Sequence, residues 1–147
     1  MSGNLDFIDP SRICIIPEGA SKQEALDQIV ALLEGNPHID DLEKVRQAVF
    51  EREAIQSTGL GNGVAVPHVR IPEVQALTIA LGIAPDGIDF DALDNNPVQI
   101  IVLFATPKDA KKTYLCFLAQ VMVALRNRNT FASLASCRTV EQVRALL

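Results

Sequence analysis

The sequence predicts a single α/β domain, a mixed β-sheet of about five strands with helices on both faces. Segments with helical spacing alternate with short β-prone segments, and some neighbours are joined by short turns. The run from Val98 to Ala105 is apolar apart from Gln99, which is typical of a strand covered on both faces. With 147 residues, 48% of them hydrophobic, the chain fits one domain over residues 1–147.

The N-terminal part predicts a strand and then a helix. Residues 12–17 are rich in β-branched isoleucine, and a proline ends the run. Ser21 and Glu24 form a Ser-x-x-Glu capping box before an apolar stripe with helical spacing, and Gly35 stops that stripe. Residues 1–9 precede the first element, so we expect them to be mobile.

A second helix is predicted from about Asp40 to Ile55. Asp40 and Glu43 repeat the capping pattern at its start. Arg52 falls in the last turns of this helix, and a glycine-rich segment follows at once. The sequence therefore places Arg52 close to that segment.

The second half of the chain predicts three strands and two helices. Turn-forming residues precede the apolar strand, a Thr-Pro pair ends it, and a threonine caps the last helix. The expected strands are 63–67, 77–84 and 98–105, and the expected helices are 110–126 and one that starts after Thr139.

The charge and hydropathy of the chain argue against several classes of function. A net charge of −5 argues against a general nucleic-acid binder, because neutralising phosphates needs clustered Lys and Arg. Residues 1–10 are short and acidic and lack the apolar core of a signal peptide. The longest apolar run, residues 100–105, is too short to span a bilayer. We therefore expect a cytoplasmic protein with protein partners, no nucleic acid and no direct membrane insertion.

The cysteines and histidines do not predict a metal site. Cys14, Cys116 and Cys137 are widely spaced and form no C-x-x-C pair, so we expect them to be reduced and structural. The two histidines, His38 and His68, are far apart in sequence, and a metal-dependent hydrolase needs clustered ligands. We expect no metal and no cofactor.

The segment STGLGNGVAVPH, Ser57 to His68, is the most informative stretch. Its glycines stand at alternate positions, where consecutive exposed N–H groups could form a concavity for an anion. A short Val-Ala-Val strand and Pro67 then deliver His68 to the end of an element, facing this loop. The order of helix, glycine loop, strand and histidine differs from both dinucleotide and nucleotide-triphosphate loops.

The residues 57–68, with 51–53 upstream and 88–98 downstream, resemble the enzyme IIA domain of the bacterial phosphotransferase system, in its fructose/mannitol and nitrogen-regulatory branch (type 2). The similarity runs from about Arg12 to the C-terminus. The resemblance implies that His68 accepts a phosphoryl group from the histidine-containing phosphocarrier protein. It also implies a downstream partner, either a transport subunit or a regulatory target protein.

Phosphoryl transfer between histidines needs a neutral imidazole nucleophile and donors for the spread negative charge. On family grounds Arg52 is the guanidinium beside the histidine, and its planar fork can hold phosphate oxygens bidentately. The other expected donors are the Ser57 or Thr58 hydroxyl and the backbone amides of the glycine loop. That loop contributes Gly59, Gly61, Asn62 and Gly63.

The chain departs from the family pattern at Tyr114, where many members carry a second histidine. A tyrosine hydroxyl can donate a hydrogen bond to a phosphoryl oxygen or to His68, but it carries no positive charge. The leading hypothesis is a phosphoryl carrier, with the nitrogen-regulatory type favoured over sugar transport. The alternative is a regulatory interaction module that does not relay phosphate.

Structural interpretations of the same residues stay open at this point. The glycines can be ordinary turn residues, and Arg52 can be a solvated helix charge. Tyr114 can be the first residue of a core-facing stripe. Apolar residues near the site, Leu60, Val69 and Ile71, are candidates for docking of the phosphocarrier.

Overall fold

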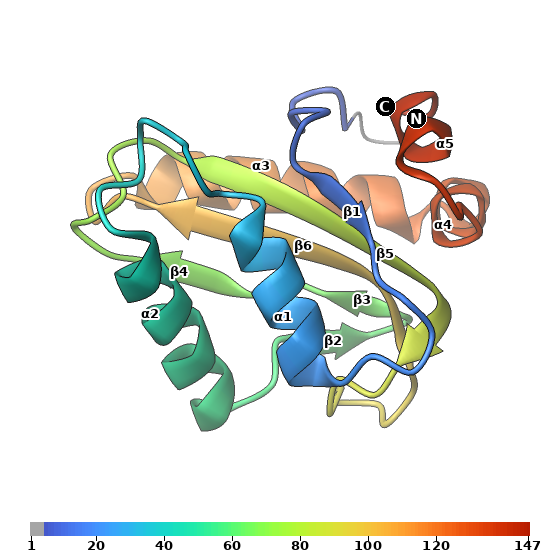
Figure 1. The fold of residues 1–147 in the computed structure, drawn as a ribbon. Coiled ribbons are helices and arrows are strands. Elements are labelled where there is room, and N and C mark those ends of the chain that lie inside the picture. The colour runs from blue at the N-terminus through green and yellow to red at the C-terminus, as the bar shows by residue number, and fades with distance from the viewer. Residues whose placement is uncertain (1–4) are drawn as a thin grey trace.

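A six-stranded mixed sheet forms the centre of the computed structural model, which describes residues 5–147 (Figure 1). The strand order is β1-β5-β6-β3-β2, and β4 also pairs with β6. The strands are β1 (Ile13–Ile15), β2 (Gly59–Gly61), β3 (Val64–Ala65), β4 (His68–Arg70), β5 (Thr78–Ile88) and β6 (Val98–Thr106). The helices are α1 (Lys22–Ala31), α2 (Leu42–Ile55), α3 (Lys111–Arg126), α4 (Arg128–Ala135) and α5 (Val140–Arg144).

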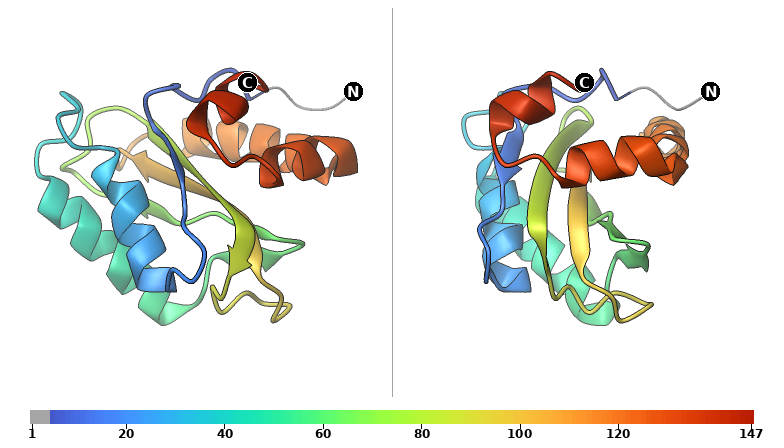
Figure 2. Two further views of the ribbon diagram at one scale, coloured as in Figure 1. Left: turned by 45° about the vertical axis from the view of Figure 1, so that its right-hand side comes forward. Right: turned by 90° about the vertical axis from the view of Figure 1, so that its right-hand side faces the viewer.

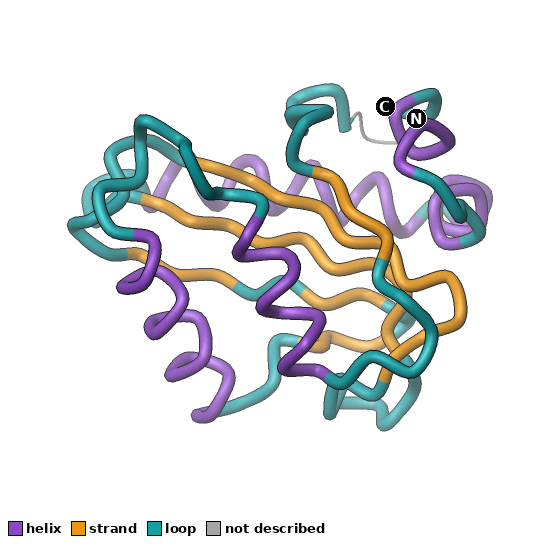
Figure 3. Tube along the Cα trace, in the orientation of Figure 1, coloured by secondary structure: helices purple, strands orange, loops and turns teal. Residues whose placement is uncertain are grey.

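Helices cover both faces of the sheet. Helices α1 and α2 pack on one face, and α3, α4 and α5 lie on the other (Figure 2). Strands β5 and β6 run antiparallel through the middle and are buried along most of their length. The tube view shows the strands between these two helical layers (Figure 3). The predicted α/β class, with a mixed sheet and helices on both faces, is confirmed.

The helix starts agree closely with the capping signals. Ser21 caps α1, and its capping box with Glu24 is complete. Helix α2 begins one residue later than expected, because Asp41 rather than Asp40 accepts the hydrogen bond from the Lys44 amide, at 3.2 Å. It ends at Ile55, as predicted.

Three elements were not predicted. The glycine-rich segment forms strand β2, which turns back into β3 through Asn62 and Gly63, both with positive φ. Strand β3 ends at Ala65, and after Val66 and Pro67 the chain resumes as β4, parallel to β6. Helix α4 has only 8 residues, too few to give a clear helical period.

The N-terminal segment is packed from Leu5 onward. Leu5 and Ile8 are buried in the cluster that lies under α3 and α5. The Arg144 Nε atom donates to the Pro10 carbonyl at 3.0 Å, which holds this segment near the C-terminus. The mobility expected for residues 1–9 stays a prediction, and residues 1–4 lie outside the described residues.

All three cysteines are free thiols. Cys14 and Cys137 are buried and Cys116 is exposed. Burial raises the pKa of Cys14 to about 12 and also raises the pKa of Cys137, because it penalises the thiolate. At neutral pH both buried cysteines therefore act as small apolar side chains.

The turn between β2 and β3 gives a test of packing. We expect Gly63→Ala to cost more free energy of unfolding than Gly19→Ala, by about 1–3 kcal/mol from overpacking. Both glycines have nearly the same φ, +82° and +81°, so the backbone strain is matched. A Cβ on Gly63 would lie 2.6 Å from Phe131 Cζ, whereas nothing lies within 4 Å at Gly19. Urea unfolding measures both values, and equal losses would contradict the close contact.

Candidate functional site

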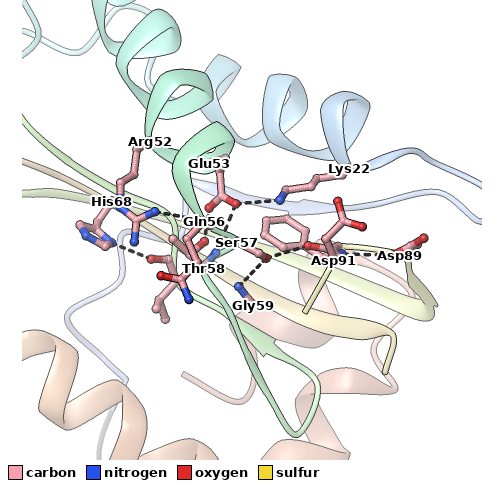
Figure 4. Close-up of polar contacts among 12 residues, drawn as sticks. Lys22, Arg52, Glu53, Gln56, Ser57, Thr58, Gly59, His68, Asp89 and Asp91 are labelled. Atoms are coloured by element: carbon pink, nitrogen blue, oxygen red, sulfur yellow. Dashed lines mark hydrogen bonds and ion pairs between the residues drawn. The ribbon is translucent and has the colours of Figure 1, made fainter. Parts of the chain in front are cut away.

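His68 is the first residue of β4 and pairs with Phe104 on β6. Its Nδ1 atom lies 3.0 Å from the Val66 carbonyl oxygen (Figure 4). A carbonyl oxygen can only accept a hydrogen bond, so Nδ1 carries the ring proton in this arrangement. In the neutral imidazole, Nε2 then holds the lone pair, which is the form that a nucleophile needs.

A pocket of about 440 Å³ adjoins His68. Three cationic side chains line it, Arg52 from the last turn of α2, Arg70 from β4 and Lys111 from the first turn of α3. The lining residues include no carboxylate. The pocket therefore combines a nucleophilic nitrogen with an excess of positive charge, which suits a phosphoryl group.

Tyr114 packs against the histidine. The rings of Tyr114 and His68 are stacked with centroids 5.5 Å apart, and Phe104 contacts the tyrosine ring edge-on at 5.3 Å. Burial raises the pKa of Tyr114, and the charge of Arg52 opposes that rise only in part. At neutral pH the hydroxyl thus stays protonated and can donate a hydrogen bond.

Arg52 approaches the site from α2. Its Nη1 atom donates to the Gln56 carbonyl at 2.7 Å, which orients the guanidinium at the end of the helix. The other N–H groups of the fork remain as potential donors to an anion. The structure thus brings together Arg52, His68 and Tyr114, each of which the sequence proposed for the site.

The turn of the β2–β3 hairpin does not reach His68. The Gly63 carbonyl accepts from the Gln99 amide, whereas His68 pairs with Phe104 five residues further along β6. At the rise of an extended strand this separation is about 17 Å. The Asn62 amide donates to an aspartate at 3.0 Å. We therefore correct the expectation for Gly61, Asn62 and Gly63, which form a hairpin turn and do not line the pocket.

The residues just before this hairpin are engaged elsewhere. Ser57 Oγ donates to the Phe90 carbonyl at 2.8 Å and accepts from the Gly59 amide at 3.0 Å. The amide and hydroxyl of Thr58 both donate to the buried carboxylate of Glu53. These contacts give Ser57, Thr58 and Gly59 a structural role, contrary to the expectation that they hold phosphate directly.

Sequence reasoning missed Lys111, which lines the pocket, and two residues behind the pocket, Lys22 and Glu53. Lys22 Nζ lies 2.8 Å from Glu53 Oε2 and 4.6 Å from the centre of the Phe90 ring. Glu53 directly follows Arg52, which was a signal for its position, but no sequence pattern pairs it with Lys22 on another helix. Val69, a candidate docking residue, is buried, whereas Leu60 is exposed.

Within residues 5–147, no group of three or more His, Cys, Asp or Glu side chains gathers in a way that could hold a metal ion. Within the same described part, every helix is too short or too polar to cross a membrane.

Comparisons with known proteins agree with this geometry. Residues 6–147 match the family described as phosphoenolpyruvate-dependent sugar phosphotransferase system, EIIA 2. A nitrogen regulatory protein of Pseudomonas aeruginosa is 31% identical over 135 residues, which cover 92% of this chain and 88% of that protein. The crystal structure of nitrogen regulatory protein IIA-Ntr from Neisseria meningitidis superposes with a TM-score of 0.83 at 30% identity, and the match covers 96% of both chains.

A fructose-specific EIIABC component of Bacillus subtilis is also 31% identical, over 108 residues, or 74% of this chain. The match spans only 17% of that longer protein. The family model and the two nitrogen regulatory relatives together cover nearly the whole chain. The chain belongs to the EIIA type 2 family of the phosphoenolpyruvate-dependent sugar phosphotransferase system.

Proposed function

We propose that this protein is a phosphoryl carrier that accepts a phosphoryl group on Nε2 of His68. The observation that carries this proposal is the contact of His68 Nδ1 with the Val66 carbonyl, at 3.0 Å. It holds the proton on Nδ1 and leaves the lone pair on the other ring nitrogen. The donor in this proposal is the histidine-containing phosphocarrier protein that the resemblance implies.

The transfer step balances without a further reactant. The Nε2 lone pair of His68 forms a bond to phosphorus, and the bond between phosphorus and the donor histidine breaks. The electron pair of the broken bond stays on the donor ring. His68 keeps its Nδ1 proton, so the phosphorylated ring is cationic and its hydrogen bond to Val66 becomes charge-assisted.

The pocket supplies positioning and charge. Arg52 and Lys111 lie on different helices that meet at His68, and both can face the phosphoryl oxygens. Their fixed positive charges stabilise a transition state whose negative charge is spread over three oxygens. The Tyr114 hydroxyl adds a neutral donor beside the ring.

We favour a nitrogen-regulatory role over sugar transport. The two nitrogen regulatory relatives are 31% and 30% identical over 92% and 96% of this chain. A fructose-specific EIIA component of Haloferax volcanii, matched over 94% of its own length, is 27% identical. In this proposal the protein acts in the cytoplasm and passes its phosphoryl group to a regulatory target, or signals with it. A separately encoded transport subunit is the other candidate for the downstream partner.

A second candidate function follows from Tyr114. The Tyr114 ring stacks on one face of the His68 imidazole. It places a neutral hydroxyl near the position where many family members carry a second histidine. A neutral group stabilises the leaving phosphoryl less than a cation does. The second proposal is therefore a module that accepts phosphate for signalling and relays it poorly.

His68→Gln tests the main proposal. We expect it to abolish the acid-labile phosphate that forms with phosphoenolpyruvate, enzyme I and the phosphocarrier, because glutamine has no nucleophilic nitrogen. Mass spectrometry under non-acidic conditions detects the product. His38→Gln is the matched control, since it removes the other of the two histidines. Absence of phosphate on the wild type, with partners active on a control protein, would overturn the proposal.

Arg52→Ala tests the role of the pocket charge. We expect the rate of phosphoryl acceptance to fall by about tenfold to a hundredfold, because a charged donor to the transition state is lost. Arg46→Ala serves as control, since Arg46 lies on the same helix but pairs with Asp27 at 2.6 Å. Rapid-quench measurement gives both rates. Equal rates for the two variants would argue that Arg52 is only a helix-terminal charge.

Tyr114→His separates the two candidate functions. If the protein relays poorly, this variant gains a group that can carry positive charge, and onward transfer rises by about tenfold, or about 1.4 kcal/mol. Tyr114→Phe controls for loss of the hydroxyl alone. The readout is the rate at which the isolated phosphoprotein loses its phosphoryl group to a downstream acceptor of this family. An unchanged rate would count against the second candidate.

A further inference from the structure

A buried ion pair lies behind the candidate site. Lys22, at the start of α1, contacts Glu53, in the last turn of α2, at 2.8 Å. The side chains are only 18% and 4% exposed. The Lys22 ammonium also lies over the Phe90 ring, which shields it further from water. Such a pair is costly to bury and weak evidence of stability by itself, so its place in the fold needs a reason.

A continuous path of hydrogen bonds leads from this pair to the nucleophile. Glu53 accepts hydrogen bonds from both the amide and the hydroxyl of Thr58. The Thr58 carbonyl accepts from the Val66 amide at 3.0 Å. The Val66 carbonyl in turn accepts from Nδ1 of His68 at 3.0 Å. The buried carboxylate is therefore connected to the imidazole through two residues, Thr58 and Val66, and three steps. Figure 4 shows how Lys22, Glu53, Thr58 and His68 lie.

The Glu53 carboxylate also anchors the end of α2, which carries the Arg52 guanidinium. Glu53 directly follows Arg52, and the Arg52 side chain is held by the Gln56 carbonyl at 2.7 Å. Because Glu53 is anchored to Thr58 just beyond that carbonyl, the chain between them has little freedom. One buried group thus constrains both Arg52 and His68.

We propose that the Lys22–Glu53 pair is a positioning device that sets the proton on Nδ1 of His68 and aligns Arg52 with its ring. The proposal deepens the phosphoryl-carrier function and rests on it. Lys22 and Glu53 do not touch the reacting atoms, and they act through Thr58 and Val66. The ammonium pairs with the carboxylate, and the carboxylate oxygens accept from both Thr58 donors. Loss of either charge loosens Thr58 and, through Val66, the hydrogen bond to the histidine.

Glu53→Gln is the main test variant, because it keeps the side-chain size and removes the charge. We expect the ¹⁵N chemical shifts of the His68 ring to move from the pattern of a single Nδ1–H tautomer toward a mixture. The rate constant for phosphoryl acceptance should fall by about tenfold at saturating phosphocarrier, or about 1.4 kcal/mol, with little change in KM. Lys22→Met should give the same pattern with the carboxylate left in place.

Asp27→Asn is the matched control. Asp27 and Arg46 form another ion pair between α1 and α2, at 2.6 Å, but it is exposed and has no contact with Thr58. We expect this variant to keep the wild-type tautomer and rate. The proposal is overturned if Glu53→Gln and Lys22→Met lower the free energy of unfolding but leave the tautomer unchanged. The NMR readout needs no phosphocarrier, so it fails or succeeds independently of the phosphoryl-carrier function.

Discussion

The site depends on strand β6, which pairs with β5 on one side and with β3 and β4 on the other. This strand is buried on both faces and runs from the hairpin turn to the pocket. The register of β3 and β4 against β6 determines which end of the sheet the residues of these two strands occupy. Val64 lies opposite Ile100, and His68 lies opposite Phe104. A shift of one residue would turn His68 to the other face of the sheet, so the ladder decides where its imidazole points.

The site is assembled where the two helical layers approach the same sheet edge. Helix α2 brings Arg52 from one layer, and α3 brings Tyr114 and Lys111 from the other. His68 stands between them on β4, and the tyrosine ring covers one face of its imidazole. This arrangement ties Nδ1 of His68 to the backbone and leaves the lone pair of the neutral ring on Nε2. The division of roles between the two nitrogens follows from a single carbonyl, that of Val66.

The structure gathers the predicted side chains at one pocket and places the predicted backbone amides elsewhere. His68, Arg52 and Tyr114 were found from motif and resemblance, and the structure places all three at one pocket. The sequence predicts an anion loop in the glycine segment, because glycines at alternate positions allow neighbouring amides to be exposed. Instead it forms a β-hairpin, whose turn lies at the far end of β6. Sequence spacing could not distinguish these outcomes, because both need positive φ and close backbone approach.

Local interactions within the sequence determined the fold class, the capping box of α1, the end of α2 and the apolar central strand. These features depend on residues a few positions apart, such as Ser21 with Glu24. Tertiary structure alone decided the pairing of Lys22 with Glu53 and the stacking of Tyr114 on His68. These contacts join residues from different elements, and only the packing of those elements on the sheet brings them within reach. The proton position on His68 depends on both the local sequence and the tertiary structure. Val66 is near His68 in sequence, but Thr58 and β6 hold the Val66 carbonyl in place.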